Sequence, residues 1–335
     1  MLTGSHTMKA VVMRGYGAPN VLEYVQDAPR PQCAANQVVI AVEAASVNPL
    51  DCKTRSGELR LMLRRRFPLV LGNDVSGRVV KVGADVEGFA PGDEVFCMLD
   101  ANARRACNGF AMSGSYAEYA VTRADTLCRK PQNLSHVEAA AVPLAALTAH
   151  QALVDRAKLR EGQRILINGA SGGVGSFAVQ IAKALGAHVT AVCSARNVEL
   201  VEGLGADRVI DYRETDFCEE SRQYDVVYDV VSNRSFGECC GVLGPAGVYV
   251  QNVATLSSFA FPLVRPAAKL FGREKRLEHV WVTPSGEELA KVARLIEAGA
   301  VRPVVESVYP LDRAAQAHEA VESGGAAGKT VLRVA

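Results

Sequence analysis

The chain has 335 residues, and its 37 lysines and arginines nearly balance 36 aspartates and glutamates, leaving a formal net charge of +1. This balance gives no support for a nucleic-acid partner. Hydrophobic residues make up 49% of the chain, which argues against global disorder. No uninterrupted apolar run has the length of a transmembrane helix, so we expect no stable membrane insertion. The length accommodates two domains of ordinary size.

The N-terminus and the cysteines indicate the setting of the protein. Residues 1–7 are polar, and their Gly4-Ser5-His6 resembles a remnant of cloning, so we expect the native chain to begin at Met8. A native leader is the alternative. The cysteines are odd in number and form no C-x-x-C pair, which predicts free thiols in a reducing compartment, here the cytoplasm. The adjacent Cys239 and Cys240 are expected to pack rather than react.

The first third of the chain predicts a compact β-rich domain. Residues 8–13 and 37–47 have the β-branched composition of strands, and glycines and prolines separate further short segments up to about residue 100. The character changes near Pro131. Ser135 and Glu138 have the spacing of a capping box. Pro143 interrupts the alanine-rich segment that follows, which predicts helices over 135–142 and 144–158.

From Arg164 onward strands and helices alternate, which predicts an α/β fold with a doubly wound parallel sheet. The predicted strands cover residues 164–168, 188–193, 208–210, 225–230, 247–251 and 279–283. The predicted helices cover residues 176–185, 197–204 and 235–242.

The C-terminal segment is expected to rejoin the β-rich domain. An amphipathic helix is predicted over 285–298, and a strand, a helix and a strand over 304–308, 311–323 and 330–334. The β-rich domain is therefore expected to comprise residues 8–126 and 301–335, and the α/β domain residues 127–300.

Residues 164–175 read R-I-L-I-N-G-A-S-G-G-V-G and predict a strand, a tight glycine turn and a helix. Such a turn directs the N–H groups of a helix N-terminus outward, where they hold a pyrophosphate. In the frame G-x-G-x-x-G the chain has Ala170, Gly172 and Gly175. One glycine is replaced, yet the flanking strand and helix favour a dinucleotide site. A glycine turn without a ligand is the alternative.

The end of the second strand favours NADP(H). An acidic residue there would bind the ribose hydroxyls of NAD, whereas a cation accommodates the 2′-phosphate of NADP. The chain has no acid between Cys193 and Asn197, but Ser194 offers a hydroxyl and Arg196 a planar donor fork. A cation at a helix start is disfavoured unless an anion is nearby. The alternative is a solvated Arg196.

Several short segments occur in one order and spacing. They are A-A-S-V-N-P-L-D (44–51), G-N-D-V-S-G (72–77), P-G-D-E-V (91–95), G-S-Y-A-E-Y (114–119), N-G-A-S-G-G-V-G (168–175), L-G-A-D (204–207) with D-Y (211–212), and G-K-T-V (328–331). In this order the chain resembles the zinc-independent quinone oxidoreductase branch of the medium-chain dehydrogenase/reductase superfamily. The resemblance covers essentially residues 8–334.

The resemblance implies a GroES-like catalytic domain, a Rossmann domain, an active site in the cleft between them, and a homodimer. It implies that the 2′-phosphate lies near Ser194, Arg196 and Tyr212. It also implies that Lys329 closes over the cofactor. The other cofactor-binding residues expected are, for the pyrophosphate turn, Ser171, Gly172, Gly173, Val174 and Gly175, and, for the nicotinamide end, Thr148, Val231 and Asn252.

Zinc-dependent members of the superfamily place cysteine and histidine ligands at positions that match Asn48 and Asn73. Asparagine is a poor zinc ligand, and Cys97 and Cys107 do not suffice for the four-cysteine lobe of those members. We therefore predict no metal. Without a Lewis acid, dehydrogenation of simple alcohols is disfavoured, while quinones and α,β-unsaturated carbonyls are favoured acceptors.

The expected reaction is hydride transfer from NADPH to a quinone or enone, with the protein orienting the reactants. Asn48 is the expected donor to a developing oxyanion, Asp51 orients Asn48 or Lys53, and Lys53 is a candidate donor. Cys52 stands where many relatives have tyrosine, and we expect a buried inert thiol there. Its modification by electrophilic quinones is the alternative.

Three questions stay open at the level of sequence. The apolar segment 259–270 is compatible with a substrate entrance, a dimer interface, a membrane contact or a buried segment. A 2-alkenal or 2-enoyl-thioester reductase would use the same fold and cofactor. A protein of another class, an NADPH-binding sensor or partner protein with little turnover, would also retain the glycine turn.

Overall fold

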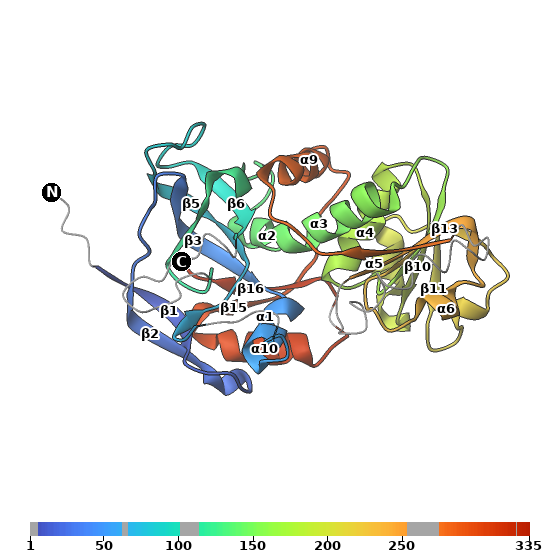
Figure 1. Cartoon of the computed structure of the whole chain (residues 1–335), viewed down its shortest axis with the longest axis horizontal. Coiled ribbons are helices and arrows are strands. Elements are labelled where there is room, and N and C mark those ends of the chain that lie inside the picture. Colours follow the sequence, from blue (N-terminus) through green and yellow to red (C-terminus); the bar gives the residue numbers. More distant parts are fainter. Residues whose placement is uncertain (1–5, 62–65, 101–113, 253–274, 326) are drawn as a thin grey trace. The chain divides into compact units, whose positions relative to one another are not determined.

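The computed structural model describes residues 6–61, 66–100, 114–252, 275–325 and 327–335. The chain divides into two compact units. Unit 1 comprises Met1–Leu144, Pro284–Glu297 and Pro303–Ala335, and unit 2 comprises Ala145–Thr283 and Ala298–Arg302. Unit 1 contains two sheets and unit 2 contains one (Figure 1).

Unit 1 contains the β-rich fold that the sequence predicts. A three-stranded sheet has the order β2-β1-β4, and a seven-stranded sheet has the order β15-β16-β3-β5-β6-β8, with β7 paired to β3. The strands of the small sheet are β1 (Thr7–Met13), β2 (Leu22–Pro29) and β4 (Leu69–Val70). Those of the large sheet are β3 (Gln37–Val47), β5 (Asp74–Val82), β6 (Glu94–Met98), β7 (Tyr119–Arg123), β8 (Leu127–Arg129), β15 (Val305–Pro310) and β16 (Lys329–Arg333).

The C-terminal strand β16 is central to the site because it pairs with β3 deep in unit 1. Thr330 is aligned with Val47 and Val331 with Ser46, in antiparallel register. On its other side β3 pairs with β5, where Ser46 is aligned with Asp74. Three segments far apart in the sequence therefore meet at one place, each contributing polar residues at a strand end.

The helices of unit 1 follow local signals in the sequence. They are α1 (Pro49–Ser56), α2 (His136–Ala140), α9 (Gly286–Glu297), α10 (Ala314–Glu322) and the first residues of α3 (Pro143–His150). The capping box is confirmed: the Ser135 hydroxyl accepts a hydrogen bond from the Glu138 N–H at 3.3 Å, and the Glu138 carboxylate accepts from the Ser135 N–H at 2.8 Å. Pro143 stands at the start of α3, where a missing N–H costs nothing.

The unit boundary differs from the predicted domain boundary. Residues 127–144 and 284–297 group with unit 1, whereas the sequence pattern assigns them to the α/β domain. Packing explains the difference. The Asn133 amide donates to the Ile296 carbonyl at 2.9 Å, and a Cβ on Gly286 would lie 2.2 Å from the Leu127 carbonyl oxygen. These close contacts hold α9 against β8.

Unit 2 contains the predicted doubly wound sheet. Its six strands have the order β11-β10-β9-β12-β13-β14, and every neighbouring pair is parallel. The strands are β9 (Arg164–Asn168), β10 (His188–Cys193), β11 (Arg208–Asp211), β12 (Tyr224–Asp229), β13 (Leu243–Asn252) and β14 (Arg276–Val280). The helices are α4 (Gly173–Ala184), α5 (Val198–Gly203) and α6 (Phe236–Cys239). Buried apolar side chains such as Leu166, Val192 and Val227 form a core beside the sheet.

Several predicted boundaries shift. For example, β13 begins at Leu243 instead of residue 247, and α6 ends at Cys239 instead of residue 242. The helix α4 begins at Gly173 rather than Ser176, because the Gly172 carbonyl already accepts the Ser176 N–H at 2.9 Å. The last strand of the sheet, β14, begins and ends three residues earlier than predicted. The predicted helix 144–158 is α3 followed by a π-helical stretch, Gln151–Ala157, that ends at Lys158 with φ of 53°. The apolar segment 259–270 and Cys107 lie outside the described residues.

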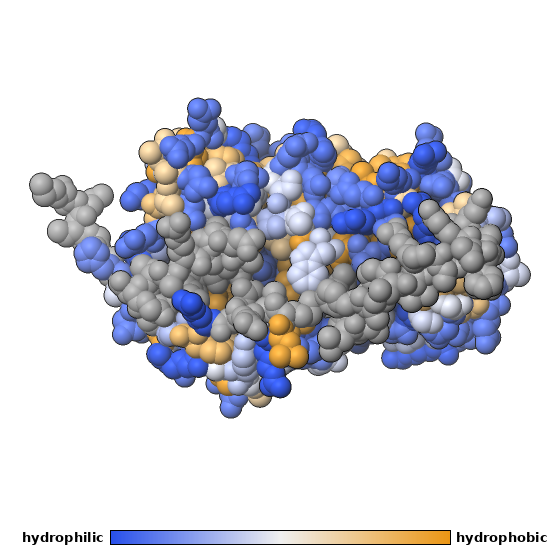
Figure 2. Space-filling model, viewed as in Figure 1, coloured by the Kyte–Doolittle hydropathy of each residue, from blue (hydrophilic) through white to orange (hydrophobic). Residues whose placement is uncertain are grey.

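Among the residues coloured by hydropathy in Figure 2, polar and charged side chains predominate, and apolar residues interrupt them in places. Among the helices that the structure describes, none combines the length and the apolar character needed to cross a bilayer.

Candidate functional site

Several residues that the sequence singles out follow strand ends at the carboxyl edge of the parallel sheet in unit 2. Strands β9, β10, β11 and β12 end there at Asn168, Cys193, Asp211 and Asp229. The strand order reverses between β9 and β12, and open α/β sheets bind ligands at the carboxyl edge beside such a reversal. The glycine turn that the sequence singles out follows β9 at this point.

Three glycines of the turn, Gly169, Gly172 and Gly175, have different local environments. Gly169 has φ of +82°, a conformation that L side chains rarely adopt. A Cβ on Gly175 would lie 2.1 Å from the Gly169 carbonyl oxygen, so α4 packs directly on the turn. A Cβ on Gly172 would meet nothing closer than that oxygen at 3.5 Å. The surface above Gly172 is thus open, and the residues present fit a dinucleotide pyrophosphate at the N-terminus of α4.

A side-chain bond stabilises the turn from the neighbouring strand. The Asn197 amide, which follows β10, donates to the Ser171 hydroxyl at 2.9 Å, and both residues are buried. The backbone N–H groups of Gly169 and Ala170 donate to the Val192 carbonyl at 3.1 Å and 3.0 Å. The turn is therefore held in place before any cofactor binds, which limits the ordering cost of binding.

The structure brings Ser194 and Tyr212 to neighbouring strand ends. Cys193 and Asp211 are aligned in the parallel pair of β10 and β11, and the Tyr212 N–H donates to the Cys193 carbonyl at 3.2 Å. Ser194 is buried, while Tyr212 is 55% exposed. Arg196 is an exposed residue of the short 3-10 helix Ala195–Asn197.

A second cation at this edge is missed by the sequence analysis. The guanidinium of Arg213 lies 5.9 Å from the centroid of the Tyr212 ring. Its direct adjacency to Tyr212 in the sequence is the signal that would have pointed to it. Arg196 and Arg213 are both exposed residues that follow the ends of β10 and β11, two strands that end together in their parallel pair.

Asp229 organises the turn after β12 and is also missed by the sequence analysis. This fully buried carboxylate accepts hydrogen bonds from the Ser232 and Arg234 N–H groups at 2.9 Å and 3.0 Å. It also accepts from the Asn168 amide at 2.8 Å and the Tyr249 hydroxyl at 2.9 Å. Its signal in the sequence is an acid that ends an apolar strand, which is rare unless the acid has several partners.

Two of the remaining cofactor candidates of unit 2, Val231 and Asn252, lie on or contact this turn. Val231 is 55% exposed, and its Cγ2 would lie 2.5 Å from a Cβ on Gly169. The Asn252 amide accepts from the Tyr228 hydroxyl at 2.9 Å and donates to the Val230 carbonyl at 3.2 Å. Asn252 therefore stabilises the turn that presents Val231. Thr148 is a buried residue of α3.

In unit 1 the N-terminus of α1 positions the predicted catalytic residues. Asn48 is the N-cap and Pro49 the first helical residue. The Asp51 carboxylate accepts from the Asn48 N–H at 2.9 Å, and its other oxygen accepts from the Asn73 amide at 2.7 Å. Asp51 therefore orients Asn73 as well as the start of the helix. Asn48 is buried, with 1% of its surface exposed, whereas Asn73 is partly exposed.

A buried ion pair lies beside this helix end. The ammonium of Lys329 donates to the Asn48 side-chain oxygen and lies 3.4 Å from the Asp74 carboxylate. Asp74 also accepts from the Ser46 hydroxyl at 2.6 Å, the Asn48 amide at 2.8 Å and the Leu144 N–H at 2.7 Å. Asp74 is fully buried and Lys329 is 4% exposed. The structure therefore holds the Lys329 ammonium within this buried network of unit 1, whereas the resemblance implies that Lys329 closes over the cofactor. The role of Asp74 is another that the sequence analysis misses, although it follows Asn73 in a motif quoted there.

Lys53 and Cys52, which also belong to α1, contact residues outside this network. The Lys53 ammonium pairs with Glu58 at 3.4 Å, and no described contact joins it to Asp51. The Cys52 sulfur lies 3.4 Å from the Nδ1 atom of the buried His318, whose Nε2 lies 3.1 Å from the Tyr116 hydroxyl. Burial raises the pKa of Cys52 to about 12 and lowers that of His318 to about 3. At neutral pH this pair is therefore a neutral thiol and a neutral imidazole, the inert form expected of Cys52.

The donor set in unit 1 does not fit zinc. The Asn48 oxygen already accepts a lysine ammonium, and the amide nitrogens of Asn48 and Asn73 donate to carboxylates. A divalent cation here would be repelled by Lys329. Among the described residues, no group of three or more histidines, cysteines, aspartates or glutamates has the arrangement of a metal site.

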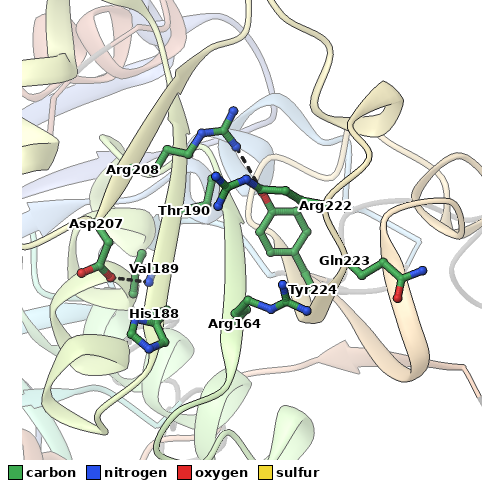
Figure 3. Close-up of a pocket in the computed structure, with 9 residues that line it drawn as sticks. All are labelled: Arg164, His188, Val189, Thr190, Asp207, Arg208, Arg222, Gln223 and Tyr224. Carbon is green, nitrogen blue, oxygen red and sulfur yellow. Dashed lines mark hydrogen bonds between the residues drawn. The ribbon is translucent and has the colours of Figure 1, made fainter.

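A separate cavity of about 340 Å³ lies at the opposite edge of the unit 2 sheet (Figure 3). Its lining residues come from the starts of β9, β10, β11 and β12 and the segment before β12. Arg208 there forms an ion pair with Glu220 and lies 3.5 Å from the Tyr224 hydroxyl. Because the glycine turn is at the other edge, this cavity is not part of the predicted cofactor site.

Comparison with known proteins gives consistent matches along the chain. Residues 34–132 match the family model described as an alcohol dehydrogenase GroES-like domain, and residues 204–332 match the model described as a zinc-binding dehydrogenase. The chain is 34% identical over 338 residues to a quinone-oxidoreductase homolog, chloroplastic, from Spinacia oleracea, covering 97% of this chain and 98% of that one.

Two further relatives and one structure extend this likeness. The chain is 35% identical to the mitochondrial NAD(P)H oxidoreductase RTN4IP1 of Homo sapiens, covering 98% and 90% of the two chains. It is 35% identical to the 2-methylene-furan-3-one reductase of Solanum lycopersicum, covering 97% and 79%. The solved quinone oxidoreductase of Coxiella burnetii matches with a TM-score of 0.84 at 32% identity, covering 98% and 99%.

Proposed function

Because this chain belongs to the quinone oxidoreductase-like branch of the medium-chain dehydrogenase/reductase superfamily, a family of NAD(P)H-dependent oxidoreductases, we propose that it reduces a quinone or another conjugated carbonyl with NADPH and without zinc. The observation that supports this most is the buried ammonium of Lys329, which bridges Asn48 and Asp74. It supplies a fixed positive charge where a metal-dependent relative would carry its cation.

Unit 2 holds the cofactor in this proposal. The pyrophosphate is bound by the backbone N–H groups that begin α4, above Gly172, and the 2′-phosphate by Ser194, Arg196 and Tyr212 with Arg213 beside them. Val231 and Thr148 line the nicotinamide end. When bound, NADPH supplies the hydride, while the protein supplies orientation and electrostatics.

Unit 1 stabilises negative charge on the acceptor oxygen. The amide nitrogens of Asn48 and Asn73 each donate to a carboxylate, and amide N–H groups are donors suited to an oxygen that gains negative charge. We propose that Asn73, the more exposed amide, contacts the acceptor oxygen directly. The buried Asn48 adds to the electrostatic stabilisation of that oxygen. Because Lys329 donates to the Asn48 oxygen, it polarises that amide and makes its N–H groups stronger donors. Asp51 keeps both residues in place. A donor role for Lys53 stays a prediction.

Replacing Arg196 by alanine is expected to change cofactor choice. A hydrogen bond to a charged phosphate contributes about 1.5–3 kcal/mol, so the Kd for NADPH should rise about 10- to 100-fold while that for NADH stays unchanged. Arg222→Ala is the matched control, because this exposed arginine lines the cavity at the opposite edge of the same sheet. Equal losses for both cofactors, or for both variants, would contradict the assignment of Arg196 to the 2′-phosphate.

The function itself is tested by NADPH oxidation. Purified protein would be assayed against ortho-quinones, para-quinones, 2-alkenals and 2-enoyl thioesters, with zinc measured on the same sample. We expect turnover with quinones and with less than stoichiometric zinc. Stoichiometric zinc would refute the metal-free mechanism. Tight NADPH binding without turnover on the whole panel would favour a sensor or partner protein.

A second candidate is an ene reductase acting on a 2-alkenal or 2-enoyl thioester. The relative from Solanum lycopersicum is named for the reduction of an exocyclic enone. The same oxyanion stabilisation serves both reactions, since hydride addition to an enone also places negative charge on oxygen. The ratio of kcat/KM for enones and quinones separates the two candidates.

The setting of the reaction is also a proposal. All described cysteines are free thiols, which suits the reducing compartment proposed, the cytoplasm. The relatives named above include chloroplastic and mitochondrial proteins, so fractionation is the direct measurement. A homodimer is the proposed assembly, and light scattering tests it.

A further inference from the structure

Two thiols from separate segments of unit 2 lie side by side. Cys218, in the short 3-10 helix Phe217–Glu219, has its sulfur 3.8 Å from that of Cys239, the last residue of α6. Cys239 is fully buried, whereas Cys218 is partly exposed. Nothing in the sequence indicates that Cys218 packs against α6, whereas Cys239 and Cys240 are visibly adjacent.

Packing and hydrogen bonds of neighbouring residues hold the Cys218 and Cys239 thiols in contact. Cys239 belongs to the core of unit 2 with Phe217 and Tyr249, and Cys218 packs against that core. The Asp216 carboxylate accepts from the Cys218 N–H at 2.9 Å and pairs with Arg234 at 3.0 Å. Since Arg234 immediately precedes the N-cap of α6, the two cysteine-bearing segments are already tied together. A disulfide has an S–S length of about 2.05 Å, so the sulfurs need to approach by only about 1.7–1.8 Å.

We propose that Cys218 and Cys239 are a modification site at which an intramolecular disulfide forms by exchange with a small-molecule disulfide such as glutathione disulfide. The partly exposed Cys218 loses its proton and attacks one sulfur of the small disulfide, which releases one small thiolate and leaves a mixed disulfide on Cys218. Cys239 then loses its proton and attacks the Cys218 sulfur, which releases the second small thiolate. Two protein thiols are oxidised and one small disulfide is reduced to two thiols.

The disulfide would close a loop that contains part of the proposed cofactor site. The segment between the two cysteines contains β12, the buried Asp229 and the turn that presents Val231. Burial raises the pKa of both thiols, so both are protonated at neutral pH and the exchange is slow. Closing the loop restricts the unfolded chain. We therefore expect the oxidised protein to unfold at a temperature several degrees higher than the reduced protein.

The experiment incubates the reduced full chain with glutathione disulfide for hours, blocks remaining thiols with iodoacetamide, and maps tryptic peptides without reduction. Cys218 lies on the peptide 214–222, apart from the peptide that carries Cys239 and Cys240. We expect a linked pair of these peptides that disappears on reduction. Cys240→Ser, the matched control, should retain the link, whereas Cys218→Ser should abolish both the link and the thermal shift.

Three results would overturn the proposal. One is a link that disappears in Cys240→Ser, which would make Cys240 the partner. Another is full alkylation of Cys218 after incubation, and the third is glutathione retained on Cys218 with no link. Cys218→Ser changes a partly exposed residue and should fold; Cys218→Ala provides a second variant with the same expectation. NADPH binding to each reduced variant verifies that unit 2 is intact.

Discussion

Replacing Lys329 by methionine should give the largest loss of stability and activity in unit 1. The substitution leaves the Asp74 carboxylate fully buried without its cation, although Ser46, Asn48 and Leu144 still donate to it. Breaking a buried ion pair by removing one partner costs about 3–5 kcal/mol. The measurement is the free energy of unfolding in urea, together with kcat for NADPH oxidation by a quinone.

The double variant Asp74→Asn with Lys329→Met separates structure from chemistry. It removes both charges, and it should recover most of the lost stability because no unpaired charge stays buried. If the ammonium stabilises the developing oxyanion through Asn48, kcat should remain reduced by about tenfold or more in the double variant, a smaller loss than removal of a direct oxyanion donor gives. Recovery of kcat together with stability would show that Lys329 serves the fold alone, and the proposed role would be abandoned.

Two alanine substitutions in the glycine turn should differ in their effect on the stability of the free protein, while both weaken cofactor binding. At Gly175 the new Cβ would lie 2.1 Å from the Gly169 carbonyl oxygen and 2.8 Å from the Ala170 Cα. Both contacts are to backbone, so the turn or the helix must move, and overpacking of this kind costs about 1–3 kcal/mol. Gly175→Ala should therefore lower the thermal midpoint and also weaken NADPH binding.

Gly172→Ala should leave the free protein unchanged. The residue has φ of −73°, and its added Cβ would make only an ordinary contact at 3.5 Å. The methyl group would instead stand where the pyrophosphate approaches the backbone. We expect a rise in the Kd for NADPH of about tenfold or more, equivalent to about 1.4 kcal/mol, measured by fluorescence titration. Unchanged binding to a stable Gly172→Ala protein would place the pyrophosphate elsewhere.

Patterns of neighbouring residues in the sequence were sufficient to predict much of the fold. The capping box at Ser135 and Glu138, the strand before the glycine turn and the helix after it depend on residues within a few positions of one another. Their signals are steric and hydrogen-bonding preferences of neighbouring residues, which the printed sequence contains directly. The parallel sheet follows from the alternation of such segments. For the same reason Ser194 and Gly172 could be assigned to one edge, since parallel strands end together, whereas the expectation for Tyr212 came from the family resemblance.

The sequence by itself therefore determined the α/β architecture, the glycine turn and the residue types that disfavour zinc at Asn48 and Asn73. Tertiary structure alone decided which groups those residues meet. Lys329 reaches Asp74 only because β16 returns beside β3, and Cys218 reaches Cys239 only because α6 packs back on the core of unit 2. Both contacts join groups distant in sequence. Packing of apolar strands and helices forms both contacts. The polar residues and thiols that meet carry no local pattern from which the contact could be predicted.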